Sequence, residues 1–151
     1  NGPRNFVAMN PTFAESAVLA LNIEHVAQRN LSPARSVADD GYREFVADAG
    51  EAPIVAGVSN EAPFLENLFR RGVERYGTNF VSGPSTMASG EGGGYRSLEV
   101  AIVTTMQAPP LYHTSGEVPE VISVPGLERM ARFLAFFLKQ VDVAPWEQLN
   151  P

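Results

Sequence analysis

The fold is decided by the stretch that runs from Val100-Ala101-Ile102-Val103 to Leu111-Tyr112-His113-Thr114-Ser115-Gly116-Glu117. The first part is an apolar run, typical of a strand that is covered on both faces. The second part is polar and precedes the longest amphipathic segment of the sequence. A strand that leads into a loop and then into a helix places that loop at the strand's carboxyl end. In open α/β sheets, ligands and metals bind at this edge.

A second apolar run, Val18 to Val26, carries polar residues only in the motif Asn22-Ile23-Glu24-His25. A loop histidine such as His113 is most often simply solvated. The second motif favours a functional site, because two polar segments then stand at the ends of two strands. We therefore expect residues 18–24 and 98–105 to form buried, parallel strands of one sheet.

The composition is that of one ordinary globular domain. The chain has 151 residues, of which 44% are apolar and 19% charged. Its net charge of −6 and eleven scattered basic residues argue against a nucleic-acid partner. Arg70-Arg71 is interpreted as part of the solvent-exposed face of a helix. No apolar run approaches membrane-spanning length and no secretory signal is visible, so no membrane partner is expected. Without cysteine the chain has no disulfide or thiolate metal site, and the compartment, secreted or cytoplasmic, stays open.

Two helices are predicted from apolar stripes. The first begins at Ser59 or Asn60 and ends at Gly77, and the second is capped by Ser123 and stops before Pro145. The residues beyond Pro145 are expected to form a terminal arm. The first stripe consists of Leu65, Leu68, Phe69, Val73 and Tyr76, and the second of Leu127, Met130, Ala131, Leu134, Phe137, Leu138 and Val141.

The remaining segments are assigned more simply. Residues 1–11 are expected to be loop, with Thr12 capping a short turn. Residues 42–47 and 54–58 are candidate strands, and a hairpin between them would be an excursion or a sheet edge. Asp39-Asp40 is either a solvated turn, the commoner case, or a metal-binding pair. The order strand, helix, strand, helix predicts an α/β fold with helices on a mostly parallel sheet.

The segment from Gly83 to Gly94 is expected to be a long loop, and it contains Gly92-Gly93-Gly94. Such loops can cradle phosphate groups, but neither a Gly-Lys-Ser/Thr motif nor the Rossmann spacing accompanies this one. A mobile loop near a site is the interpretation we favour. A small-molecule or phosphate binder that uses these glycines is the alternative.

At Asn22-Ile23-Glu24-His25 and Leu111-Tyr112-His113-Thr114-Ser115 the sequence resembles the zinc aminopeptidase family of two-metal exopeptidases. The family has a strand ending in Asn-Leu-Asp or Asn-Leu-Glu. Near its C-terminus it has Tyr-His-Thr, then an acidic residue and a last long helix. The match is best over residues 95–141 and only in outline over 29–94. It implies a three-layer phosphorylase/hydrolase-like α/β fold.

The resemblance also implies residue roles. Glu24 would bind one zinc ion, His113 the second, and Tyr112 would polarise the carbonyl of a peptide substrate, which a metal-activated water hydrolyses. His25 has no role in the family. Following Glu24 in an extended strand, it should face the other side as a packed or supporting residue.

The resemblance leaves parts of the family's site unmatched. The family's first metal-binding His, its bridging Asp and its Glu-Glu pair have no counterpart here, and the sequence starts at Asn1 rather than at a methionine. We therefore expect a single domain that is the C-terminal portion of a zinc exopeptidase domain, inactive alone and binding zinc weakly or not at all. Its partner would be the missing N-terminal half or a second copy. The alternative is a catalytically inactive interaction or structural domain.

Overall fold

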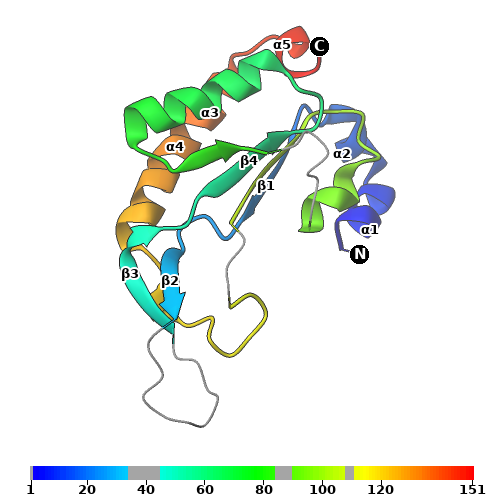
Figure 1. Cartoon of the computed structure of the whole chain (residues 1–151). Coiled ribbons are helices and arrows are strands. Elements are labelled where there is room, and N and C mark those ends of the chain that lie inside the picture. Colours follow the sequence, from blue (N-terminus) through cyan, green and yellow to red (C-terminus); the bar gives the residue numbers. More distant parts are fainter. Residues whose placement is uncertain (1, 34–44, 84–89, 108–110) are drawn as a thin grey trace.

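The computed structural model describes residues 2–33, 45–83, 90–107 and 111–151 (Figure 1). A four-stranded sheet has the order β1-β6-β4-β5. Two of its pairings, β1 with β6 and β4 with β5, are parallel, and β4 with β6 is antiparallel. The expected α/β class with a mostly parallel sheet is confirmed. The strands are β1 (Ala20–Glu24), β4 (Ile54–Val58), β5 (Phe80–Ser82) and β6 (Ile102–Met106).

The parallel pairing of the two apolar runs is confirmed. Ala20 lies opposite Ile102 and Glu24 lies opposite Met106, so both strands end at the same level. Four of the five residues of β6 are buried, as expected for a strand covered on both faces. The expectation of full burial is wrong for the end of β1, where the Ile23 side chain is 42% exposed.

The next two candidate strands do not pair with each other as a hairpin. β4 lies inside the main sheet, where it pairs with β6, because its apolar side chains are buried there. β3 (Phe45–Glu51) pairs instead with β2 (Arg29–Pro33) in a separate two-stranded ribbon that projects from the sheet (Figure 1). Asp39-Asp40 and Tyr42 lie outside the described residues.

Helices α3 (Pro63–Tyr76) and α4 (Val124–Asp142) pack together over one face of the sheet (Figure 1). The predicted ends are confirmed at Gly77, a left-handed cap with φ 68°, and at Ser123, whose Oγ accepts from the Gly126 N–H at 3.0 Å. The α3 helix begins slightly later than expected, at Pro63.

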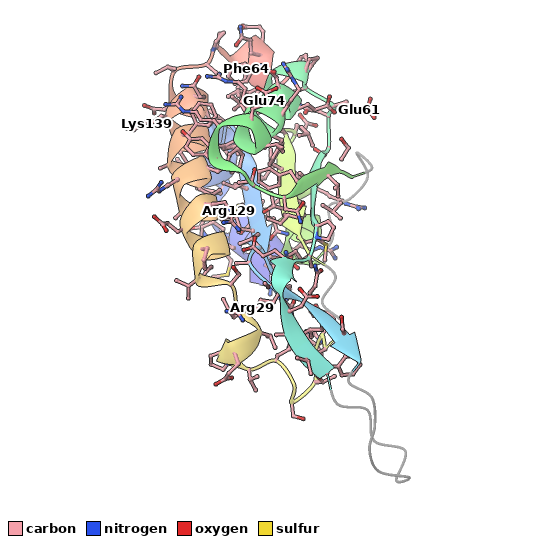
Figure 2. All side chains as sticks on the ribbon, turned by 60° about the vertical axis from the view of Figure 1, so that its left-hand side comes forward. Arg29, Glu61, Phe64, Glu74, Arg129 and Lys139 are labelled. Atoms are coloured by element: carbon pink, nitrogen blue, oxygen red, sulfur yellow. The ribbon has the colours of Figure 1, made fainter. Side chains whose placement is uncertain are left out.

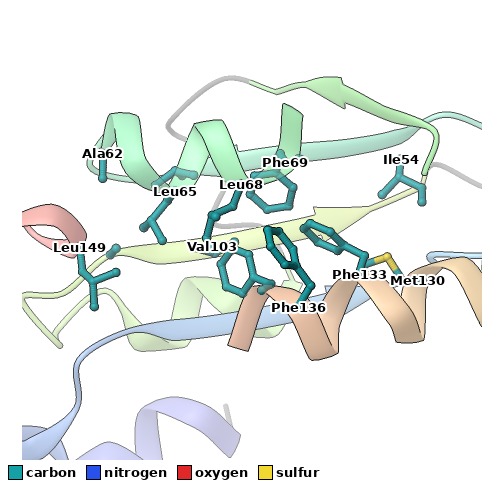
Figure 3. Packing of buried hydrophobic residues seen from close by; sticks show 14 residues of the cluster. Ile54, Ala62, Leu65, Leu68, Phe69, Val103, Met130, Phe133, Phe136 and Leu149 are labelled. Carbon is teal, nitrogen blue, oxygen red and sulfur yellow. The ribbon is translucent and has the colours of Figure 1, made fainter. Parts of the chain in front are cut away.

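The core between these helices and the sheet combines aliphatic side chains with a group of phenylalanines (Figure 3). Phe133 and Phe136 of α4 point into it, although the predicted stripe omitted both. That stripe was wrong at Leu127 and Leu138, which are 48% and 52% exposed. The helix is apolar on more than one side, so periodicity alone did not identify the buried face. Gly72 allows α3 to approach α4 closely, because a Cβ at this position would lie only 2.7 Å from the Phe133 ring.

The opposite side of the sheet carries α1 (Gly2–Met9), α2 (Pro11–Ser16) and the 3₁₀ helix η1 (Gly90–Tyr95) (Figure 1). The expectation of a loop over residues 1–11 is therefore wrong, and Asn10 rather than Thr12 precedes α2. A second 3₁₀ helix, η2 (Pro119–Val121), precedes α4. Within the described ranges, no helix combines the length and apolar character needed to cross a membrane.

The C-terminal segment is packed rather than a free arm. It forms α5 (Trp146–Leu149), whose Leu149 is buried in the core. Asn150 then bonds two strand starts: its Oδ1 accepts from the Ala101 N–H at 2.6 Å and its Nδ2 donates to the Val18 carbonyl at 3.1 Å. A buried apolar residue and a paired amide thus hold the end of the chain against the sheet.

Gln107 joins three segments where the sheet ends. Its fully buried side chain accepts from the Gln28 N–H at 2.7 Å and donates to the Ala52 carbonyl at 2.5 Å. Gln28 follows β1, Ala52 precedes β4 and Gln107 itself follows β6. The Gln107 amide therefore provides hydrogen-bond partners for backbone groups that lie outside the strands. Such groups are costly to bury unpaired.

Replacing Gln107 with leucine should destabilise the fold. Gln107→Leu keeps the volume but leaves the Gln28 N–H and the Ala52 carbonyl without this partner, which should lower the free energy of unfolding by about 2–4 kcal/mol. Urea unfolding followed by circular dichroism measures the change. The exposed Gln148 provides the matched control, and Gln148→Leu should stay within about 0.5 kcal/mol of the parent. Equal stabilities of the two variants would contradict this role for Gln107.

Candidate functional site

The two polar motifs meet at the carboxyl edge of β1 and β6. The Gln107 N–H donates to the His25 carbonyl at 3.2 Å directly after the two strands end. Beyond this bond, the rings of His25 and Tyr112 contact edge-to-face, with centroids 5.2 Å apart and planes at 85°. The segments that follow Glu24 and Met106 therefore lie side by side, as their placement at strand ends predicts.

The loop around His113 is held in shape by its own hydrogen bonds. The Thr114 hydroxyl donates to the Leu111 carbonyl at 2.6 Å and accepts from the Gly116 N–H at 3.2 Å. The carboxylate of Glu117 accepts from the His113 N–H at 3.0 Å. The acidic residue after Tyr-His-Thr thus fixes the backbone of the loop, which positions the two rings.

Both histidines of the chain adopt left-handed backbone conformations. His25 has φ 46° and His113 has φ 57°, in a region that residues other than glycine seldom occupy. The expectation of an extended His25 that packs on the far side is wrong, since its exposed ring turns towards Tyr112. The Tyr112 ring also stacks on His113 at 3.8 Å and remains 48% exposed. Strained backbone conformations of this kind cluster at functional sites. Here the two histidines and Tyr112 present two imidazoles and a phenol to solvent.

The carboxylate of Glu24 is fixed on the face of β1 that carries η1. The Asn22 amide donates to Glu24 Oε1 at 2.7 Å, and both side chains share one face because residues two apart in a strand do so. Gly90 lies directly against this carboxylate, since a Cβ built there would be only 2.1 Å from Oε1. The alternation along β1 could have identified Asn22 as the partner of Glu24. Nothing in the sequence pattern indicated Gly90.

The described residues do not provide a complete metal site. No group of three or more His, Cys, Asp or Glu side chains gathers among them. Glu24 and His113 supply one carboxylate and one imidazole, whereas catalytic zinc takes three protein ligands and structural zinc four. These two residues therefore do not fit a zinc ion without further donors. Their opening onto one cleft stays a prediction.

The glycines of the predicted phosphate-binding loop are packed in η1 rather than presented as an open loop. A Cβ at Gly92 would lie 3.1 Å from the Asn22 amide, and one at Gly94 would lie 2.7 Å from Pro3 Cβ. These glycines let η1 approach β1 and α1 closely. The expectation of a loop is wrong for residues 90–94, and residues 84–89 lie outside the described residues.

An apolar cavity adjoins the His113 loop. It has a volume of about 530 Å³ and lies between the β2–β3 ribbon and residues 111–121. Leu31 and Phe45 of the ribbon line one side, and Leu111 and Val118 line the other. The site therefore combines polar rings with a neighbouring apolar recess of the size that small ligands occupy.

Comparisons with known proteins add no family assignment. No protein-family model matches the chain, and searches of curated proteins and of solved structures found no similar protein. Any function must therefore be argued from the geometry of the site.

Glu51 is the centre of a second cluster near the same edge. Its carboxylate accepts from the Ser123 hydroxyl and from Arg129 Nη2, the latter at 2.5 Å (Arg129 is labelled in Figure 2). Burial raises the pKa of Glu51, but the hydrogen bonds from Arg129 and Ser123 and the charge of Arg129 outweigh burial, so the pKa lies below its ordinary 4.5. With its partners satisfied, this carboxylate ties β3 to the start of α4.

The Glu51 cluster should make stability depend on pH. Because the folded-state pKa is lowered, the stabilisation is present above pH 4.5 and is lost as pH falls through the folded-state value. At neutral pH, Glu51→Gln should lower the free energy of unfolding by about 1–3 kcal/mol, and the gap from the parent should shrink in acid. Denaturant unfolding across pH measures this. Glu128→Gln, in the exposed pair with Arg132, should cost less than about 1 kcal/mol.

Gly90 should not tolerate a side chain. Gly90→Ala adds a methyl group at φ 57° that collides with the Glu24 carboxylate, so it should destabilise the chain by about 2–4 kcal/mol. Gly2→Ala is the control, because a Cβ there meets nothing within 4 Å, and its effect should stay within about 0.5 kcal/mol. Thermal unfolding compares the two. A neutral Gly90→Ala would show that the carboxylate is not held where we describe it.

Proposed function

We propose that this chain is the C-terminal part of a zinc-dependent exopeptidase of the aminopeptidase type, with a three-layer phosphorylase/hydrolase-like fold. The observation that carries the proposal is the meeting of the Glu24 and Tyr112-His113 segments at the carboxyl ends of two adjacent parallel strands. This edge is where open α/β sheets bind ligands and metals. The two motifs that contain the metal ligands implied by the resemblance thus lie in segments that contact each other.

Each site residue has a proposed part in peptide hydrolysis. Glu24 and His113 contribute one metal ligand each, and the Tyr112 hydroxyl donates a hydrogen bond to the oxygen of the scissile carbonyl. Two features support these roles: the Asn22 amide orients the Glu24 carboxylate, and Glu117 fixes the backbone of His113. The apolar recess beside the loop suits a peptide with an apolar side chain.

The complete site needs groups that the described residues do not supply. One carboxylate and one imidazole do not form a zinc site, so we derive no metal-dependent step for this chain alone. The remaining ligands and a general base would come from an N-terminal half of the domain or from a second copy. Among the described residues β1 pairs only with β6, which leaves a strand edge where such a partner can add.

Two other functions remain as alternatives. A catalytically inactive interaction or structural domain is favoured by the incomplete donor set. A phosphate binder that uses residues 92–94 has less support, because Gly92 and Gly94 are packed against Asn22 and Pro3.

The proposal predicts activity only in the assembled enzyme. We expect the purified chain with added zinc to be inactive on aminoacyl anilides, and its mixture with the upstream-encoded segment to hydrolyse them. In that mixture Glu24→Gln and His113→Gln should each lower kcat/KM by about 10²-fold or more, because a ligand is lost, and Tyr112→Phe by about 10–10²-fold. The release of the aniline product is measured by absorbance.

His25→Gln is the matched control for that experiment. His25 shares the exposure, the left-handed backbone and the Tyr112 contact of His113, yet it has no proposed ligand role. Its variant should retain activity within about threefold. An inactive mixture would contradict the exopeptidase proposal. If the isolated chain is active and Glu24→Gln abolishes this activity, the conclusion that the chain alone lacks a complete site is wrong.

A further inference from the structure

Four basic side chains of this acidic chain gather on the outer surface of α3 and α4. They line a shallow cavity of about 470 Å³, together with the rings of Tyr76 and Phe136. These are four of the eleven basic residues, which look scattered in the sequence. Figure 2 shows Lys139 on this surface, far from Arg29 of the ribbon. The four are Arg71, Arg75, Arg132 and Lys139.

Two of the guanidinium groups are held by the aromatic floor. Arg71 Cζ lies 4.7 Å from the centre of the Phe136 ring. Arg75 Cζ lies 5.5 Å from the Tyr76 ring and 5.7 Å from the Phe136 ring. A guanidinium above a ring is attracted to its face, which limits the positions of the group before any ligand arrives. Arg71 Nη1 donates to Gln140 Oε1 at 3.4 Å, and the other guanidinium N–H groups can donate to a ligand.

The charges of the cluster are poorly balanced. Arg71 and Arg75 stand four residues apart on α3, a spacing at which like charges destabilise a helix. Glu74, which lies between them in sequence, pairs with Arg70 at 3.3 Å. Within the described part of the chain, no carboxylate pairs with Arg71, Arg75 or Lys139.

Only one of the four basic side chains has an acidic partner among the described residues. Arg132 pairs with Glu128 at 2.5 Å, and both side chains are more than half exposed. Such an exposed pair is weak and can yield to a ligand of higher charge. Most of the positive charge of the cluster is therefore not neutralised by neighbouring carboxylates, although the chain as a whole has a net charge of −6.

We propose that this cavity binds a small polyanion, specifically a short chain of phosphate groups. The planar fork of arginine suits phosphate oxygens, and three arginines and a lysine face one recess. A volume of about 470 Å³ lies in the range of small-molecule sites. A ligand with several charges balances the four cations, which a single carboxylate does not. The site is remote from the His113 loop and independent of the exopeptidase proposal.

The test is calorimetric titration of the whole chain with tripolyphosphate at about 0.15 M salt. We expect saturable binding that weakens as salt rises, because the contacts are between charges. The double variant Arg75→Gln and Lys139→Gln should weaken binding about tenfold or more. Arg70→Gln is the matched control, since Arg70 is on the same helix but outside the cavity, and it should change affinity less than about twofold.

Other ligands distinguish the source of the phosphate chain. Equal affinity for ATP and tripolyphosphate would assign the site to the phosphates themselves, and tighter binding of ATP would assign it to a nucleotide. Citrate that binds as tightly as tripolyphosphate would overturn the phosphate assignment. The proposal also fails if tripolyphosphate does not bind at millimolar concentration, or if the folded double variant binds like the parent. Arg132→Gln, an exposed single change, repeats the comparison if the double variant does not fold.

Discussion

The architecture depends on how backbone groups are satisfied where the sheet stops. Past Glu24 and Met106 the strands β1 and β6 no longer pair, and the chain turns towards the β2–β3 ribbon and the His113 loop. The buried amide of Gln107 bonds the backbones of Gln28 and Ala52 at this point. Because an unpaired buried backbone group costs about 1–3 kcal/mol, this single side chain permits the edge to open without losing the fold. Of the residues proposed for function, Glu24 is the last residue of β1, and Tyr112 and His113 follow Gln107 in the chain.

The sequence allowed good prediction wherever one local rule decided the outcome. A helix end needs a left-handed cap, which identifies Gly77, and a hydroxyl at a helix start identifies Ser123. The apolar run Val100-Ala101-Ile102-Val103, which leads into β6, identifies a central strand. Prediction failed where tertiary contacts choose between equally apolar options. Helix α4 carries leucines and phenylalanines on several sides, and the close approach at Gly72 selects the Phe133 side.

The candidate site was predictable in part for the same reason. The motifs of Glu24 and His113 stand at strand ends, so the meeting of their segments follows from the parallel pairing. The left-handed turn at His25 was not predictable, because a residue other than glycine seldom adopts it and its contacts, the Gln107 N–H and the Tyr112 ring, come from distant segments. Gly90 was also missed, since its importance arises from a 3₁₀ helix that begins 66 positions after Glu24 in the chain. Contacts of this kind leave no periodic pattern.

The pairing of β1 with β6, strands far apart in the sequence, has a consequence for folding kinetics. Ala20 pairs with Ile102, and the Asn150 amide bonds the Val18 carbonyl across 132 positions. During synthesis β1 therefore cannot form this pairing until residues 102–106 have left the ribosome. Long-range pairings of this type slow folding, and an early strand without its neighbour is open to mispairing with other chains. A chaperone that shields residues 18–24 during translation would raise the yield of folded protein more than one that acts on α3 or α4.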